Sequence, residues 1–238
     1  MIEQLTEEYV MNYFKGKTVL VLGSAKCVGL LKPDFMDTFE IIVRCNNYKI
    51  FNACTRTDVY YSFLGGSIKK SMDDIVKDGA KFVFCRCPDM NFAAHVNGKY
   101  IPGKSFDARP VYEQRKNWFK LPYYIQTYKN YRRNYALCDR LLSTGVSAII
   151  DVLRYDPARL FVAGFDFFTT LIHNVDEPCN LNTGHNFSGE FELVRDLVFR
   201  KKIECTKQMR LLFTLGSWEH IKAVNDAEKL RRSKENIC

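Results

Sequence analysis

Two short blocks of this sequence combine residue types that could bind an anion and move a proton. In the first, Ser143, Thr144 and Gly145 precede an apolar run with helical spacing. Hydroxyl groups at a helix start cap its free N–H groups, and the positive end of the helix dipole attracts a carboxylate or phosphate. A plain N-cap without a ligand is the alternative, and the block alone does not decide between them.

The second block places His185 directly ahead of another amphipathic segment that contains Glu190. Near the positive end of a helix dipole the imidazolium is disfavoured, so the neutral imidazole is favoured at pH 7. A general base for a sugar hydroxyl needs that neutral state. His173 lies on the same connection and could donate to a phosphate. The alternative is a His185 that only hydrogen-bonds within its loop.

The elements that would position these residues are apolar strands alternating with amphipathic helices. Apolar runs cover 17–23, 39–45, 58–63, 80–86, 158–164 and 209–215. This alternation predicts an open, mostly parallel α/β sheet, which binds ligands beyond the carboxyl ends of its strands. Gly23 ends the first strand, where a ligand can approach the backbone closely, and Gly164 ends a later one. Asn46 follows the second strand and could contact a ribose or base, with ordinary turn chemistry as the alternative.

Composition and charge narrow the class of protein. The chain has 238 residues, 47% hydrophobic and 26% charged, which predicts a single globular domain over 1–238. No apolar run approaches the roughly 18–20 residues of a membrane span, and the N-terminus lacks a signal-like apolar core, so we expect a cytoplasmic protein. The net charge of +8 favours an anionic partner.

Several classes of site are not supported. Residues 23–29, GSAKCVG, match neither the dinucleotide-binding nor the P-loop glycine pattern. No second Cys or His pair completes a zinc site beside Cys85 and Cys87. The sequence also contains no Asp-x-Asp triplet that could hold a metal ion at a phosphate. We therefore expect neither a metal nor a cofactor.

One segment departs from the alternation of strands and helices. Residues 91–135 are basic and aromatic, and we interpret them as an insertion or lid that closes over a sugar nucleotide. In that case Tyr123, Tyr124, Arg132 and Arg133 could neutralise a departing phosphate, together with His173. An ordinary solvated insertion is the alternative.

The order of these blocks resembles that of sialyltransferases. The matching stretches are VLVLGSAK, FEIIVRCNN, TRTDVYYS, STGVSAIIDVLRYDPARLFVAGFDFF and GHNFSGE. The chain is similar to the compact bacterial sialyltransferases that build cell-surface oligosaccharides. Its STG and H-x-x-x-x-E blocks also resemble those of the animal-type enzymes. The resemblance covers most of 17–200, apart from the basic segment, and implies a Rossmann-like, glycosyltransferase-A-like domain that inverts the anomeric carbon.

The resemblance also implies roles for individual residues. His185 corresponds to the general base on the acceptor hydroxyl, and Glu190 supports it. The residues expected to bind the donor are Gly23, Ser24, Asn46, Ser62, Ser143, Thr144, Gly145 and Gly164. Ser24 and Ser62 stand where the family has asparagine, and Phe168 stands where the bacterial members have a phosphate-binding tyrosine.

We therefore predict an inverting, metal-independent glycosyltransferase. It would move sialic acid or a related acidic sugar from a CMP donor to a hydroxyl of a glycan or glycolipid, without a nucleic-acid partner. The basic C-terminal segment, 229–238, would make any peripheral contact with a membrane. Two alternatives remain open: a non-catalytic nucleotide- or nucleic-acid-binding α/β protein, and a transferase for a different nucleotide sugar.

Overall fold

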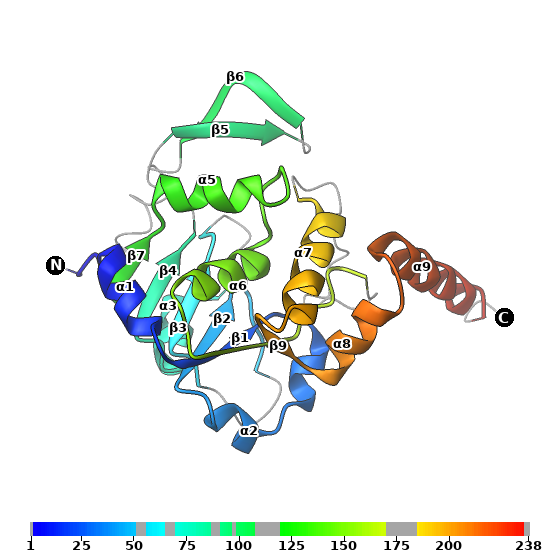
Figure 1. The fold of residues 1–238 in the computed structure, drawn as a ribbon, viewed down its shortest axis with the longest axis horizontal. Helices are drawn as coiled ribbons and strands as arrows, with labels where there is room; N and C mark the ends of the chain where they lie inside the picture. Colours follow the sequence, from blue (N-terminus) through cyan, green and yellow to red (C-terminus); the bar gives the residue numbers. More distant parts are fainter. Residues whose placement is uncertain are drawn as a thin grey trace.

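The chain folds around one open sheet (Figure 1). The computed structural model describes residues 2–50, 56–64, 70–86, 91–96, 99–107, 120–169 and 185–235. Within these ranges seven strands form the main sheet in the order β7-β4-β3-β2-β1-β8-β9, and each neighbouring pair is parallel. They are β1 (Thr18–Leu22), β2 (Ile41–Cys45), β3 (Val59–Ser62), β4 (Phe82–Cys85), β7 (Tyr123–Ile125), β8 (Arg159–Ala163) and β9 (Glu204–Cys205). This confirms the predicted α/β class with a mostly parallel sheet flanked by helices.

The central strands are apolar because both faces of the sheet are covered. In β1, Val19 and Val21 belong to the core on one face, whereas Leu20 and Leu22 belong to the core on the other. Successive side chains of a strand point to opposite faces, so a strand buried on both sides reads as a continuous apolar run. This is the run that the sequence shows at 17–23.

Helices cover both faces. They are α1 (Glu7–Phe14), the 3₁₀ helix η1 (Lys26–Leu30), α2 (Pro33–Asp37), α3 (Met72–Lys77), α5 (Tyr128–Ala136), α6 (Thr144–Arg154), α7 (Phe187–Phe199), α8 (Lys207–Thr214) and α9 (Trp218–Glu235). Buried residues of α1, α6 and α7 share one core, and those of η1, α2 and α3 lie against the opposite face. The sheet is thus the middle layer of three.

The strand order reverses beside β1, which is the feature that positions a site. Strands β2, β3, β4 and β7 extend from β1 in one direction, and β8 and β9 extend in the other. In open α/β sheets ligands bind beyond the carboxyl ends of the strands at such a reversal. Helix α6 leads directly into β8 and α7 into β9, so both helices begin at this carboxyl edge.

The sequence run 209–215 was predicted to be a strand, and that prediction is wrong. Residues 209–214 lie in α8 and Leu215 is its C-cap; the Thr206 side chain caps the start of the helix by accepting a hydrogen bond from the Met209 N–H at 3.3 Å. Met209 and Phe213 are buried four residues apart, while Leu211 is exposed. That spacing buries one face of a helix, so the run has helical rather than strand periodicity.

The segment 91–135 is only partly an insertion. Strands β5 (Asn91–Val96) and β6 (Lys99–Asp107) pair as an antiparallel hairpin, which Figure 1 shows beyond α5, away from the main sheet. Residues 123–136, by contrast, form β7 and α5 of the main body, with β7 paired to β4. Residues 108–119 lie outside the described part of the chain.

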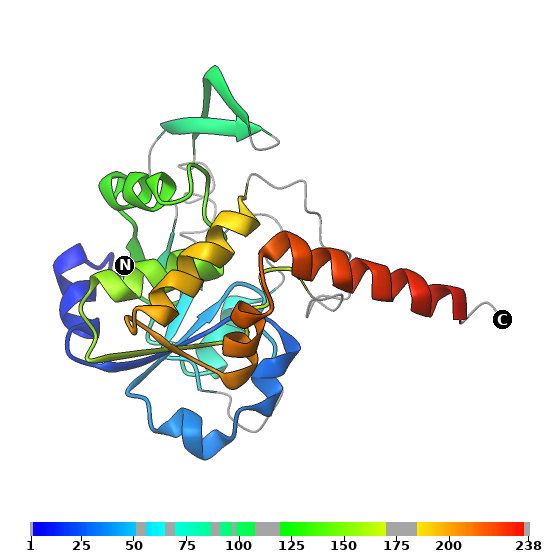
Figure 2. The same ribbon diagram turned by 45° about the vertical axis from the view of Figure 1, so that its right-hand side comes forward.

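The last helix leaves the body of the molecule. Figure 2 shows α9 extending away from the sheet. Its first residue, Trp218, still contacts the body, because its indole N–H donates to the Phe167 carbonyl at 2.8 Å. Across the described residues, no helix is both long enough and apolar enough to cross a bilayer.

Candidate functional site

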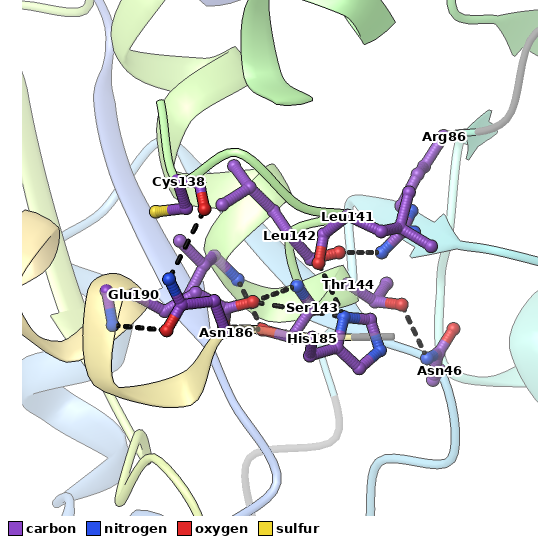
Figure 3. Close-up of polar contacts among 12 residues, drawn as sticks. Asn46, Arg86, Cys138, Leu141, Leu142, Ser143, Thr144, His185, Asn186 and Glu190 are labelled. Carbon is purple, nitrogen blue, oxygen red and sulfur yellow. Dashed lines mark hydrogen bonds and ion pairs between the residues drawn. The ribbon is translucent and has the colours of Figure 1, made fainter. Parts of the chain in front are cut away.

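Residues from five separate segments meet at the carboxyl edge of the sheet (Figure 3). Asn46 follows β2, Ser62 ends β3 and Arg86 follows β4. The N-termini of α6 and α7 bring a second group of polar side chains to the same edge. Parallel strands and the helices that precede β8 and β9 therefore place residues far apart in sequence side by side.

Asn46 connects the strand ends to the start of α6. Its side-chain oxygen accepts hydrogen bonds from the Ser62 hydroxyl at 3.1 Å and from the Phe63 N–H at 3.3 Å. Its side-chain nitrogen donates to the Thr144 hydroxyl oxygen at 3.0 Å. The backbone of Asn46 has φ 45°, a left-handed conformation that asparagine tolerates better than most residues. Contacts with the described residues leave this amide one N–H to offer a ligand.

Ser143 and Glu190 connect the starts of α6 and α7. The Ser143 N–H donates to one carboxyl oxygen of Glu190 at 2.5 Å, and the Ser143 hydroxyl donates to the other at 2.6 Å. Glu190 is 1% exposed. Burial raises the pKa of Glu190 to about 7, although the Ser143 hydrogen bonds and the Arg86 charge oppose this shift. Glu190 is thus partly protonated at neutral pH.

His185 presents one defined ring nitrogen. Its Nδ1–H donates to the Leu141 carbonyl at 2.7 Å, which leaves the lone pair on Nε2. In Figure 3 the Nε2 side of the ring faces Asn46 and Thr144. Burial, followed by the positive charge of Arg86, lowers the pKa of His185 to about 4, against a smaller opposing effect of the Leu141 hydrogen bond. The imidazole is therefore neutral at pH 7.

The physical cause of that neutrality differs from the one expected from sequence. The sequence suggested the dipole of the following helix, whereas burial and Arg86 are the largest effects in the structure. Glu190 Oε1 lies 3.9 Å from Nδ1, but this contact is a salt bridge only if the ring is protonated. The Nδ1–H group of His185 already donates to Leu141, and Glu190 is itself partly neutral. Glu190 therefore does not stabilise the doubly protonated, positively charged form of the His185 ring.

Arg86 is a site residue that the sequence analysis missed. It is 2% exposed, and its Nη1 donates to the Leu142 carbonyl at 2.5 Å. The available signal was its place in the sequence: a charged residue directly after a buried strand, like Asn46 after β2. That position puts it at the ligand-binding edge of a parallel sheet.

The three predicted donor-binding glycines are needed for contacts within the protein. A Cβ on Gly23 would lie 2.2 Å from the Gly164 carbonyl oxygen, and one on Gly164 would lie 2.2 Å from Val28 Cγ2. A Cβ on Gly145 would lie 2.5 Å from Cε1 of the Phe165 ring. Neighbouring protein atoms therefore fill the space on the Cβ side of each glycine, while the Gly145 N–H stays at the start of α6.

The remaining predicted residues fall into two groups. Ser24 follows Gly23 at the same edge and is partly buried. His173 belongs to 170–184, outside the described residues.

Among the side chains that are described, no three His, Cys, Asp or Glu are grouped to hold a metal ion.

Tyr123 and Tyr124 require a correction. They lie in β7 and are 6% and 2% exposed, with Tyr123 in the core on one face of the sheet and Tyr124 in the core on the other. The Tyr124 ring packs edge-on against Phe84 at 4.8 Å between centroids. Adjacent residues of a strand point to opposite faces, so these two phenols cannot share one phosphate site. They are core residues rather than parts of a lid.

Comparisons with known proteins give structural similarity only. No family model matches the chain, and no curated protein does. Sialyltransferase CstII from Campylobacter jejuni, in complex with the substrate analogue CMP-3FNeuAc, superposes with TM-score 0.47 and 11% identity over 79% of this chain and 78% of its own. A variant of sialyltransferase Cst-II in complex with CMP gives TM-score 0.44 and 11% identity over 79% and 80%. An alpha-2,3-sialyltransferase from Campylobacter jejuni in apo form gives TM-score 0.45 and 13% identity over 86% and 78%.

Proposed function

We propose that this protein is an inverting, metal-independent glycosyltransferase that moves sialic acid or a related acidic sugar from a CMP donor to a hydroxyl of a glycan or glycolipid. One observation carries the proposal. A neutral imidazole with its lone pair on Nε2 shares the carboxyl edge of the sheet with the N-terminus of α6. A base and an anion-binding helix start are the two components that such a transfer requires.

The donor would be held at the start of α6. Ser143 caps the helix, and the N–H groups of Thr144 and Gly145 have no hydrogen-bond partner among the described residues. These two groups and the Thr144 hydroxyl suit the carboxylate of an acidic sugar. Asn46 would contact the nucleotide part of the donor through its remaining N–H.

The acceptor hydroxyl would hydrogen-bond to His185 Nε2. As that oxygen attacks the anomeric carbon from the face opposite CMP, its proton passes to Nε2, and the bond to the phosphate oxygen breaks. Because the pKa of His185 is about 4, the ring is neutral at pH 7, and its Nε2 lone pair is available to the acceptor hydroxyl. His173 is the candidate donor of a hydrogen bond to the departing phosphate.

The test pairs ligand binding with turnover. A thermal-shift comparison of CMP, UMP and GMP should show stabilisation by CMP, since a ligand of the native state raises apparent stability. The His185→Gln variant should lose at least about a hundredfold of turnover of CMP-sialic acid while binding CMP normally. The exposed His220 on α9 supplies the matched control, because His220→Gln should keep full activity.

Other outcomes would point to the alternatives. Full turnover in His185→Gln would eliminate His185 as the base. Stabilisation by UMP or GMP instead of CMP would indicate a different nucleotide sugar. Oligonucleotide binding that weakens steeply with salt, without any response to CMP, would support a nucleic-acid-binding protein. A loss of turnover in excess EDTA would contradict metal independence.

A further inference from the structure

Three consecutive residues before α6 are each bound by a different ionisable side chain, of which Arg86 and Glu190 are buried and His185 is partly buried. The Leu141 carbonyl accepts from His185, the Leu142 carbonyl accepts from Arg86, and the Ser143 N–H donates to Glu190. Figure 3 shows these contacts converging on the loop from two sides. The direction of each peptide group in this loop is therefore set by side chains from β4 and α7.

Arg86 is an unusual group to bury at this place. It is 2% exposed, and no carboxylate of the described residues lies within ion-pair distance of it. Its backbone N–H donates to the Ser62 carbonyl at 2.9 Å, and its guanidinium lies 5.4 Å from the centre of the Phe63 ring. Removing a guanidinium from water costs free energy unless its contacts compensate, so a buried charge at the ligand-binding edge of the sheet is consistent with a role at the site.

The contact with Leu142 acts directly on the neighbouring peptide. The Leu142 carbonyl lies in the Leu142–Ser143 peptide group, which is joined to the Leu141–Leu142 peptide group through the two backbone torsions of Leu142. Because the Leu142 side chain is itself buried, at 2% exposed, these torsions are restricted, and displacement of the Leu142 carbonyl would displace the Leu141 carbonyl as well. The Leu141 carbonyl is the acceptor that keeps the imidazole proton on Nδ1. If that carbonyl turned away, the ring could carry its proton on either nitrogen, and Nε2 would no longer be reserved for a substrate.

We propose that Arg86 is a positioning residue for His185, because it fixes the loop whose Leu141 carbonyl selects the imidazole tautomer. The consequence for catalysis rests on the proposed function, whereas the effect on the tautomer does not. Arg86 itself touches neither reacting group.

The charges around the ring agree with this role. Burial has the largest effect on the pKa of His185, and the charge of Arg86, directly after β4, has the second largest; both lower it. Glu190 approaches from α7 but binds Ser143 through both oxygens. The Cys138 thiol, in the loop before α6, has its pKa raised by burial and then by Glu190. Glu219 of α9 contacts Ser188 on α7.

The experiment observes the ring nitrogens directly by ¹⁵N NMR of histidine-labelled protein, with the His185→Gln variant identifying the signals of His185. In wild type, His185 should be protonated at Nδ1 and should titrate near pH 4. In Arg86→Met, its midpoint should rise by at least about one pH unit, and the two tautomers should mix. Arg86→Lys should retain a low midpoint, because it keeps the charge, but should lose the single tautomer.

The control is Arg159→Met, which removes an arginine that pairs with Glu204 at the far side of the sheet. It should leave the His185 signals unchanged. An unchanged midpoint and tautomer in Arg86→Met would overturn the proposal. If Arg86→Met does not fold, a single Nδ1–H tautomer in Arg86→Lys, or an Nε2–H tautomer in wild type, would overturn it equally.

The two proposals can fail separately. Full turnover in His185→Gln would remove the proposed base but would leave the NMR result for Arg86 intact. An unaffected ring in Arg86→Met would remove the role of Arg86 while His185→Gln still lost activity. If both hold, the acid limb of the kcat/KM profile should move to higher pH in Arg86→Met, because protonation of the base would then occur at higher pH.

Discussion

Glu190 accepts two hydrogen bonds from Ser143, one from its backbone N–H and one from its hydroxyl, and so joins the first turn of α7 to the N-cap of α6. Each of these helix starts carries one half of the proposed chemistry, the anion site on α6 and the base beside α7. The distance between the two halves thus depends on a buried carboxyl group rather than on the sheet alone.

Replacement of Glu190 by glutamine should change how stability depends on pH. Because the pKa of Glu190 is raised from 4.5 to about 7, the folded protein binds more protons than the unfolded chain in this window. Its contribution to stability is present below pH 4.5 and is lost as pH rises through 7. Glu190→Gln should therefore become more stable relative to wild type between pH 5 and pH 8, by at most about 3 kcal/mol.

Urea unfolding at both pH values measures this difference, and the contribution of His185 cancels because both proteins contain it. Glu204→Gln is the control. Arg159 lowers the pKa of Glu204 below 4.5, so this carboxyl is largely ionised in the folded and unfolded chain above pH 5, and its stability curve should run nearly parallel to that of wild type. Parallel stability curves for Glu190→Gln and wild type would contradict a raised pKa at Glu190.

The pH dependence of kcat/KM should report the low pKa of His185. A base with a pKa of about 4 stays neutral down to about pH 5, so activity should fall only below that point. An imidazole with its ordinary pKa would instead lose activity below about pH 6.5. Steady-state rates with CMP-sialic acid between pH 4 and pH 8 distinguish the two. An acid limb centred near 6.5 would show that the ring is not held neutral by its surroundings.

Substitution of Asn46 should separate its side-chain contacts from its backbone conformation. Asn46→Ala removes three side-chain hydrogen bonds and also places alanine at φ 45°, and we expect a loss of roughly 3 kcal/mol of unfolding free energy. Asn46→Gly removes the same contacts but accommodates the positive φ. It should thus be about 1 kcal/mol more stable than Asn46→Ala in denaturant unfolding. The reverse order would mean that backbone strain at Asn46 is negligible.

Addition of a methyl group at Gly145 tests whether this glycine is required for packing within the protein or for access of a ligand. The new Cβ in Gly145→Ala would lie 2.5 Å from the Phe165 ring, so we expect destabilisation of about 1–3 kcal/mol. Adding Phe165→Leu should recover part of that loss, which a double-mutant cycle measures as a coupling between the two sites. A Gly145→Ala protein with wild-type stability but weakened CMP binding would instead show that the glycine is there for the ligand.

The arrangement of strands could be predicted well because it depends on local patterns. Apolar runs such as 17–23 and 39–45 stand out from their flanking residues, and their short, continuous form is typical of a strand buried on both faces. The strand prediction for 209–215 was wrong because a short apolar stretch fits a helix as well as a strand. Only the burial of Met209 and Phe213 on one side distinguishes the helix from the strand. The phosphate-binding role predicted for Tyr123 was wrong because the sequence does not show which aromatic residues of a basic segment enter the core.

The sequence by itself determined the alternation of strands and helices and the residue types at their ends, including His185 before α7 and Asn46 after β2. Tertiary structure alone decided that Arg86 and Glu190 bind the loop before α6, and that protein atoms occupy the Cβ side of Gly23, Gly145 and Gly164. The reason is physical. Strand and helix patterns arise from neighbours in sequence, whereas the charge, burial and hydrogen-bond partners of His185 come from residues more than 40 positions away.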